Sequence, residues 1–316
     1  MRLQAPRPGS RLRLVQVLLG VVWLVDGALQ LQPAMFRRGF VTSVLLPSAS
    51  GNPTPVASSI TSMAQFLEPH IAMWNALFAL TQLAIGAGLL LRRTVKPALV
   101  ASFGWSLLVW VFSEGLGGLL TGRASPITGA PGAVLLYVLV GLVAWPRGHS
   151  GRCEPVSVVG SGLLGDAGAR LAWAVLWVGS GLLLLQPANL TPKAVSDAVL
   201  GAAAGQPAWF SGVLSGVAGA LGTDGVVLSA ILAAEMAVIG VGVALRWHDQ
   251  ALMGAAVGVA LLIWVFGEGL GGVLTGTGTD PNTGPLLILL ALALTPSVGD
   301  RAGTDPRLPA WQGEAA

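Results

Sequence analysis

The chain has 316 residues, of which 53% are hydrophobic and only 10% are charged. An ordinary soluble domain carries roughly a quarter charged residues, so this composition excludes a soluble protein and predicts a membrane protein. The formal net charge of +3 reflects where Lys and Arg lie around the predicted membrane spans. It gives no reason to predict binding to nucleic acid, and the predicted surroundings are a lipid bilayer.

Six apolar runs approach the length of about 20 residues that a helix needs to cross the bilayer core. They cover residues 14–31, 71–91, 98–112, 171–185, 226–245 and 251–266. Two shorter runs, 133–145 and 286–294, follow each set of three. We therefore predict an all-α polytopic protein with eight transmembrane helices. The first run follows four arginines but lacks a nearby small-residue cleavage site, so we predict a retained helix and no signal peptide.

Apolar residues recur at helical spacing in segments 56–67 and 210–221, which are too short and too polar to span. A one-sided apolar stripe of this length is typical of a helix that lies in the membrane interface. We therefore predict one such helix on the outer surface of each half.

One motif, Trp-Val-Phe-Xaa-Glu-Gly-Leu-Gly-Gly, occurs at 110–118 and again at 264–272. The offset, 264 − 110 = 154, also aligns Trp23 with Trp177, Pro33 with Pro187, Gly86 with Gly240 and Arg92 with Arg246. An offset that persists over more than a hundred residues predicts a tandem duplication. We expect a first repeat at 1–146, a cytoplasmic linker at 147–166, a second repeat at 167–296 and a disordered cytoplasmic tail at 297–316.

Each predicted repeat has an even number of spans, so the two repeats are parallel and related by an axis along the membrane normal. Both termini then lie on one side, and that side carries thirteen of the Lys and Arg residues against four on the other. The positive-inside bias predicts that both termini are cytoplasmic. The predicted location is a bacterial plasma membrane.

The repeated motif is the first candidate site. Trp110 and Trp264 lie four residues before Glu114 and Glu268, a spacing that places each ring and carboxylate on one helix face. Glycine-rich exits and short helices at matching places in two halves indicate a binding site on the outer side. If the third and seventh helices line the interface between halves, the two glutamates share a cavity. Alternatively, each glutamate caps its own loop beneath its own Trp, or the glycines serve packing alone.

Four further polar residues are candidates for substrate binding. An ionised Asp26 facing lipid would cost on the order of 3 kcal/mol, so we expect it to face the interior or a wet cavity, unless it reaches the headgroups. Glu235 lies near the middle of the sixth predicted helix, where it either carries protons or is a neutral structural residue. Gln32 and Gln186 lie at matching outer helix tips.

A soft ligand set on the outer side, His70, Met73 and Met63, is a weak candidate for copper(I). The second half has no equivalent set, so we predict no metal site.

One half of the chain resembles the DoxX family of four-helix membrane proteins. The resemblance rests on the outer tip Gly27-Ala-Leu-Gln-Leu, on a proline-containing outer segment, and on the helix from Glu235 through Gly240 and Gly242 to Arg246. It implies a membrane subunit of a redox system with quinone as its cofactor and redox proteins as its partners, and it leaves open whether this chain is an enzyme. The alternatives are a proton-coupled small-molecule transporter that uses Asp26, Glu235 and the motif glutamates, and a scaffold without chemistry of its own.

Overall fold

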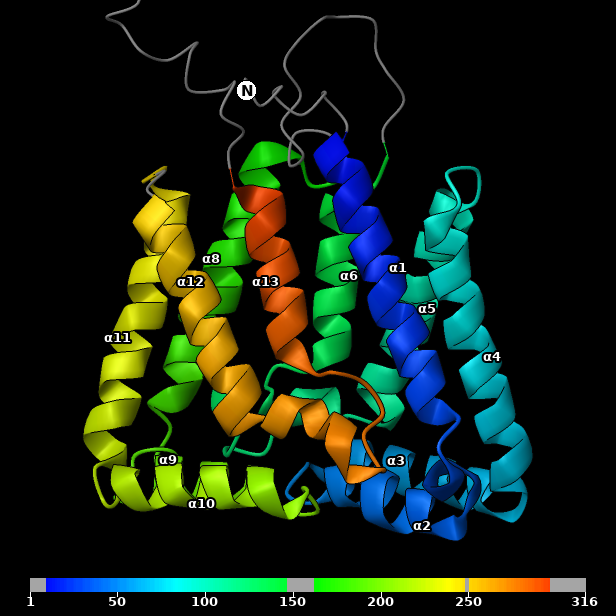
Figure 1. The fold of residues 1–316 in the computed structure, drawn as a ribbon, viewed down its shortest axis with the longest axis horizontal. Helices are drawn as coiled ribbons and strands as arrows, with labels where there is room; N and C mark the ends of the chain where they lie inside the picture. Colours follow the sequence, from blue (N-terminus) through cyan, green and yellow to red (C-terminus); the bar gives the residue numbers. More distant parts are fainter. Residues whose placement is uncertain (1–9, 147–161, 248–249, 296–316) are drawn as a thin grey trace, which may run out of the picture.

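A computed structural model describes residues 10–146, 162–247 and 250–295, which are all-α (Figure 1). The upright helices of the first half are α1 (Ser10–Gln30), α4 (Ile71–Leu90), α5 (Val95–Phe112) and α6 (Ala133–Val143). Those of the second half are α8 (Gly165–Leu184), α11 (Gly225–Ala244), α12 (Gln250–Leu262) with its continuation η7 (Ile263–Gly267), and α13 (Thr283–Leu294). The predicted tail at 297–316 and most of the predicted linker fall outside the described residues.

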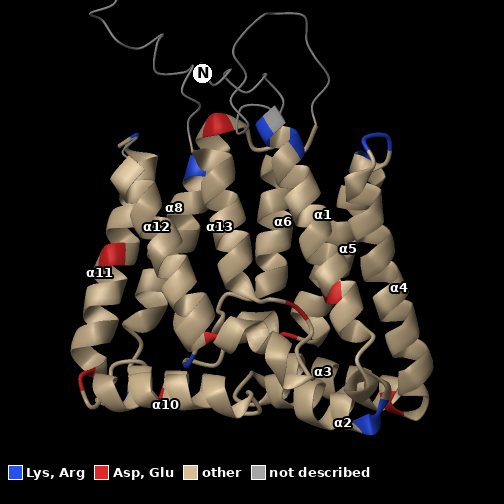
Figure 2. Cartoon of the chain, in the orientation of Figure 1, with Lys and Arg blue, Asp and Glu red and all other residues tan. Residues whose placement is uncertain are grey.

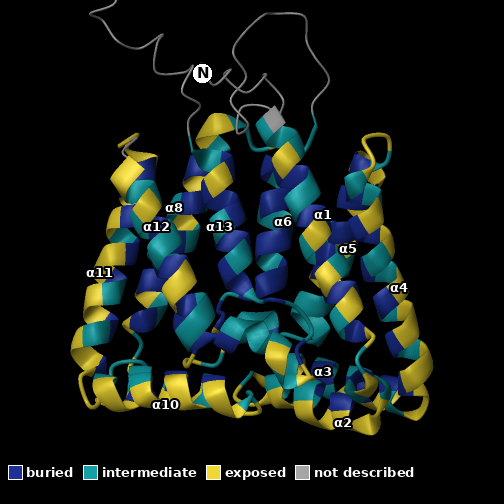
Figure 3. Ribbon diagram, viewed as in Figure 1, coloured by how far each residue is buried: buried dark blue, intermediate teal, exposed yellow. Residues whose placement is uncertain are grey.

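Six helical segments are long and apolar enough to cross a membrane, which suggests a multi-pass membrane protein. They are Arg11–Gln30, Thr54–Leu90, Val95–Phe112, Gly165–Leu184, Gly225–Ala244 and Gln250–Gly267. The helices α6 and α13 are shorter, with 11 and 12 residues. Figure 3 shows exposed positions along the outer flanks of α4 and α11, and many of these residues are large and hydrophobic, as a lipid-facing surface requires.

A second layer of helices lies across the end of the bundle opposite the described N-terminus (Figure 1). It contains α2 (Arg38–Phe40), α3 (Thr54–Leu67), α9 (Ala194–Ala202), α10 (Ala208–Leu221) and the short turns η1 (Pro33–Phe36), η2 (Val41–Leu45), η3 (Leu46–Ala49) and η4 (Glu68–His70). Ile60, Ala64 and Leu67 are the buried residues of α3, and Phe210, Leu214 and Ala218 are those of α10. These residues recur every three or four positions, as the sequence pattern predicts for a one-sided apolar helix.

Glycines allow the first two upright helices of each half to pack closely. A side chain on Gly20 would meet the carbonyl oxygen of Gly86 at 3.0 Å, and one on Gly86 would meet that of Gly20 at 2.8 Å. In the second half, Gly181 lies against Ala233 and Gly240 lies against Ala174 and Val178. Small residues let helix backbones approach where lipid provides no hydrophobic drive for association.

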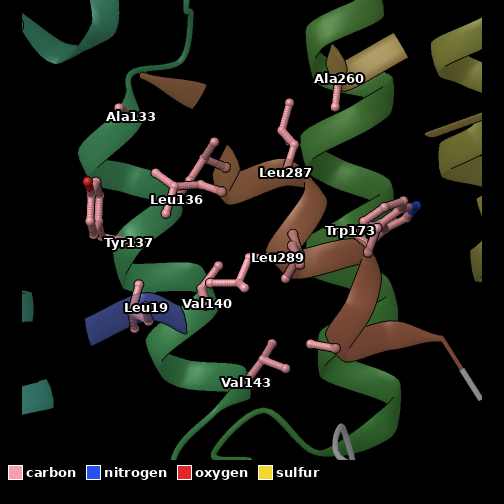
Figure 4. Close-up of a cluster of buried hydrophobic side chains, with 14 of the residues drawn as sticks. Leu19, Ala133, Leu136, Tyr137, Val140, Val143, Trp173, Ala260, Leu287 and Leu289 are labelled. Atoms are coloured by element: carbon pink, nitrogen blue, oxygen red, sulfur yellow. The ribbon is translucent and has the colours of Figure 1, made fainter. Parts of the chain in front are cut away.

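The two halves share one apolar core, and α6 contacts α13 at its centre. Figure 4 shows Leu136 and Val140 of α6 beside Leu287 and Leu289 of α13. Across the same interface α1 contacts α13, α6 contacts α8, and η6 (Pro126–Thr128) contacts α8, α9 and η7. The seventh predicted helix therefore reaches the interface through its end η7, where Gly267 lies against Ile127. The third predicted helix, α5, mainly contacts helices of its own half, so the condition that both helices line the interface is met only in part.

Basic residues gather at one end of the bundle, where the described chain begins (Figure 2). A smaller basic group lies around α2 at the other end, and acidic residues occur inside the molecule near that second end. The candidate sites lie among these internal acids.

Candidate functional site

Each copy of the repeated motif forms a left-handed turn. Residues 115–118 and 269–272 all have φ between 55° and 69°. The turns are closed by hydrogen bonds from Gly117 N–H to the Glu114 carbonyl (3.0 Å) and from Gly271 N–H to the Glu268 carbonyl (2.9 Å). Left-handed backbone costs about 1–2 kcal/mol for an L-residue with a side chain, so three of the four positions are glycine. The turns fall within η5 (Leu116–Gly118) and η8 (Gly269–Thr275).

The left-handed turns fit directly against the chain that precedes α6 and α13. A side chain on Gly117 would lie 1.9 Å from the carbonyl oxygen of Pro131, and one on Gly271 would lie 2.4 Å from the carbonyl carbon of Pro281. Neither position has room for a methyl group. The glycines of the motif therefore allow both the left-handed backbone and its close contact with the segments that precede α6 and α13.

The Trp and Glu of each motif hold the start of the following short helix. Trp110 Nε1 donates to the carbonyl of Pro131 (2.9 Å), and Trp264 Nε1 donates to that of Pro281 (2.8 Å). Glu114 Oε1 accepts from the N–H of Val134 at 3.4 Å.

Glu268 makes the same kind of contact in the second half. Its Oε2 accepts from the N–H of Gly284 at 3.3 Å, and its Oε1 accepts from the hydroxyl of Thr283. A carboxylate at a helix N-terminus satisfies free N–H groups and interacts favourably with the helix dipole. The Trp and Glu of each motif therefore hold the start of α6 or α13 inside the protein, and we call this arrangement the clamp. Each glutamate caps the short helix of its own half.

The two motif glutamates also line one cavity of about 420 Å³, which we call the polar cavity. Gln206, Asp280 and Asn282 line it as well, together with Thr275, Thr277 and Thr279. The two arrangements that the sequence offered as alternatives, separate caps and a shared cavity, therefore occur together.

Burial perturbs the acids of the polar cavity, which lie beyond the last residues of the predicted spans. It raises the pKa of Glu114 to about 8, with the charge of Asp280 adding to the effect. It raises the pKa of Glu268 to about 7, although the hydrogen bond from Thr283 opposes the rise. The pKa of Asp280 is also raised by burial, against hydrogen bonds from Thr279 and Asn282. Near neutral pH, Glu114 is therefore mostly protonated, whereas both protonation states of Glu268 are populated.

A second cavity, of about 270 Å³, lies within the first half and is called the aromatic cavity. Residues of α1, α3, α4, α5 and α6 surround it. Its aromatic walls are Trp23, Phe40, Phe66, Trp74, Phe78, Trp105, Phe112 and Tyr137, and its polar residues include Asp26, Gln30, Gln82 and Asp280. Asp280 comes from the second half, so this cavity draws on both halves.

Asp26 is a buried acid that lines the aromatic cavity. It is only 2% exposed, and its Oδ2 accepts a 2.5 Å hydrogen bond from the hydroxyl of Tyr137, whose ring lies 4.4 Å from that of Trp23. Among the described residues, Asp26 Oδ1, Gln30 Oε1 and Gln82 Oε1 have no hydrogen-bond partner. Buried polar atoms are rarely left unpaired, so these three acceptors need donors, which water or a polar ligand can supply.

Gln32 and Gln186 line neither cavity. Gln32 Nε2 donates to the carbonyl of Gly278 (3.1 Å), which ties the tip of α1 to the exit loop of the second half. The Oε1 atom of Gln186 is buried without a described partner.

Of the other predicted site residues, only Met63 lines either cavity. Glu235 is exposed on α11 and lines neither cavity. Of the weak metal candidates, His70 and Met73 are exposed, whereas Met63 lines the aromatic cavity.

Sequence reasoning missed Gln82, Tyr137 and Asp280. Gln82 interrupts an apolar run at mid-span, and Tyr137 is the chain's one tyrosine, so both carried a usable signal. Asp280 lies in an exit loop whose fold was not readable from the sequence.

No family model, curated protein or solved structure matches the chain.

Proposed function

We propose that the protein is a tandem repeat of two four-span units with both termini in the cytoplasm. Helix bounds support the repeat, because α3 and α10, and likewise α4 and α11, differ by 154 residues (208 − 54 and 225 − 71). The Trp–Pro contacts support it too, although the second exit loop is four residues shorter, with sequence separations of 21 and 17. The basic end shown in Figure 2 favours a cytoplasmic location for the end where the chain begins.

We infer that the first repeat binds a quinone headgroup in the aromatic cavity and serves as a membrane subunit of a redox system. One observation carries this proposal: unpaired polar atoms of Asp26, Gln30 and Gln82 lie in a cavity walled by aromatic rings. A quinone is a flat ring with oxygen atoms at opposite edges, so it needs ring-stacking walls and polar partners. Such a ligand carries electrons and protons between membrane enzymes.

The residues present fit that group. The unpaired atoms Gln30 Oε1, Gln82 Oε1 and Asp26 Oδ1 are acceptors, so they match the hydroxyl donors of the quinol form, while the amide nitrogens of the two glutamines can donate to a carbonyl oxygen of the quinone. Tyr137 already donates to Asp26 Oδ2, which fixes that carboxyl while leaving its other oxygen available. The resemblance to DoxX proteins agrees with this proposal and is not needed for it.

One observation favours the transporter as a second candidate. Asp280 and Thr279 line both cavities, so a line of acids runs from Asp26 through Asp280 to Glu114 and Glu268. Such a line suits proton or cation movement between the interior and the polar cavity. Glu235 has no part in this path because it lines neither cavity.

The proposal is tested by equilibrium dialysis of a short-chain quinone and its quinol against the purified protein in nanodiscs. We expect saturable binding that Asp26→Ala or Gln82→Ala weakens about fivefold or more, since each removes a polar partner worth about 1 kcal/mol. The matched controls Ser180→Ala and Met236→Leu alter positions 154 residues later and should bind normally. Binding unaffected by all four changes would refute the site.

A further inference from the structure

Glu235 lies in the middle of α11 on a surface that no described residue of this chain covers. It is the eleventh of the 20 residues of α11, and its side chain is exposed. Ile231, one turn before it, and Val238, one turn after it, are 59% and 54% exposed. Figure 2 shows this acidic position on α11, apart from the internal acids, and no other residue of that helix is acidic.

A carboxylate on a lipid-facing surface at mid-span is costly unless another group pairs with it. The equivalent position of the first half, Thr81, has no such need, because its hydroxyl donates to the Leu77 carbonyl of its own helix (2.8 Å). The exposed surface of α11 therefore carries a carboxylate that needs a partner, whereas the corresponding surface of α4 carries a hydroxyl that is already hydrogen-bonded.

A second copy of this chain offers no cation at the right depth. Within the described residues of the upright helices, the basic residues are Arg11, Arg13, Lys96 and Arg170, and each lies within the first six residues of its helix. A symmetric contact through α11 would instead place two Glu235 carboxylates together. Like charges at that depth repel each other.

We propose that the α11 surface around Glu235 binds a transmembrane helix of a different protein, and that this helix carries a Lys or Arg at mid-membrane depth. Ala230 and Ala234, one turn apart, are also exposed on α11, and small residues there permit close approach of a partner backbone. The buried ion pair supplies the specificity, because a helix without a basic residue leaves the carboxylate unpaired. This inference does not depend on quinone binding.

The test uses the full-length protein in liposomes with labelled leucine-rich transmembrane peptides that carry a single central Lys, Leu or Glu. Energy transfer between protein and peptide reports association. We expect the Lys peptide to bind at least tenfold more tightly than the Leu peptide, a difference of about 1.4 kcal/mol. Glu235→Gln should abolish this preference, and Thr81→Val, at the matched position, should leave it intact.

Reversing the charge at position 235 should create a new binding preference, and a folding defect could not produce one. Glu235→Lys should reject the Lys peptide and bind the Glu peptide. Equal binding of the Lys and Leu peptides by the unmodified protein, or a Lys preference that survives Glu235→Gln, would overturn the proposal. Dimers in single-molecule photobleaching that disappear in Glu235→Gln would also overturn it, since the occupant would then be a second copy.

Discussion

The two halves of the molecule use the same clamp for the short helix but surround different interiors. Trp110 and Glu114 hold α6 as Trp264 and Glu268 hold α13. In contrast, the aromatic cavity has polar or aromatic residues where the second half has smaller or aliphatic ones. Matching positions in the two halves are 154 residues apart before the exit loop and 150 residues apart after it, because the second exit loop is four residues shorter. The pairs that differ are Asp26 and Ser180, Trp74 and Leu228, Phe78 and Leu232, Gln82 and Met236, Trp105 and Val259, and Tyr137 and Leu287.

This contrast separates architecture from function. Features present in both halves, such as the left-handed turns and the helix caps, shape the fold. Features of one half only, such as the Asp26–Tyr137 hydrogen bond and the exposed Glu235, are the candidates for chemistry and recognition. Matched substitutions in the two halves can therefore test each assignment.

The largest expected effect is that of a methyl group in the left-handed turn. Gly117→Ala and Gly271→Ala should each prevent stable folding, because the new side chain strains the backbone and collides with Pro131 or Pro281. Gly104→Ala and Gly258→Ala, which meet nothing within 4 Å, are matched helical controls. Recovery of monodisperse protein and its unfolding temperature are the measurements. Normal recovery of both turn variants would mean that the clamp is not needed for the fold.

The second effect is a fall in stability as pH rises. Glu114 and Glu268 have folded-state pKa values of about 8 and 7, above the ordinary value of 4.5. Between these values the unfolded chain loses protons that the folded protein keeps, so the stability present at low pH is lost as pH rises. The loss is on the order of 3 kcal/mol for Glu268 and larger for Glu114.

Thermal unfolding from about pH 5 to 8.5 measures the slope of stability against pH. Glu114→Gln and Glu268→Gln should flatten it, while Glu68→Gln, at the end of the bundle, should leave it unchanged. Stability that rises with pH would show that the caps are ionised in the folded protein.

A third, smaller effect distinguishes the interiors. Tyr137→Phe leaves the Asp26 carboxyl without its donor and should destabilise the protein by about 1–3 kcal/mol. Ser180→Ala, at the position that matches Asp26, should change stability by less. A chemical unfolding series compares them, and equal losses would remove the distinction between the two interiors.

The smallest expected effect is the loss of the Trp hydrogen bond in either copy of the clamp. Trp110→Phe and Trp264→Phe each remove one hydrogen bond to a proline carbonyl, and each should cost about 0.5–1.5 kcal/mol. Trp209→Phe, at a side chain that is 66% exposed, is the control. A clear difference between the two motif variants would argue against equivalent clamps.

The sequence predicted the helices well but not the way in which they pack. The run 71–91 became α4 and 226–245 became α11 within a residue, because length and apolar content decide a span. Which side of α11 faces lipid was not readable, since that helix is apolar on every side except at Ser229 and Glu235. The two roles expected for Glu235, a proton carrier or a neutral structural residue, therefore rested on its depth alone.

The candidate site was predicted only in part. Asp26 was expected to face the interior because exposure to lipid is costly, and it does. The left-handed sign of the Gly-Leu-Gly-Gly turn was missed, since glycine tolerates either sign of φ. Asp280 was missed because its approach to Asp26 depends on an exit loop that is four residues shorter than its counterpart.

The central claim, that the ligand site is the aromatic cavity of the first half and that the second half has no equivalent site, is tested most directly by photolabelling. A photoreactive short-chain quinone would be crosslinked to the protein in nanodiscs, and the modified residues identified by mass spectrometry. The account predicts labels on the walls of the aromatic cavity, such as Trp74, Phe78 and Trp105, that an excess of unlabelled quinone removes. Equal labelling of the matched positions Leu228, Leu232 and Val259, or labels that no competitor removes, would contradict it.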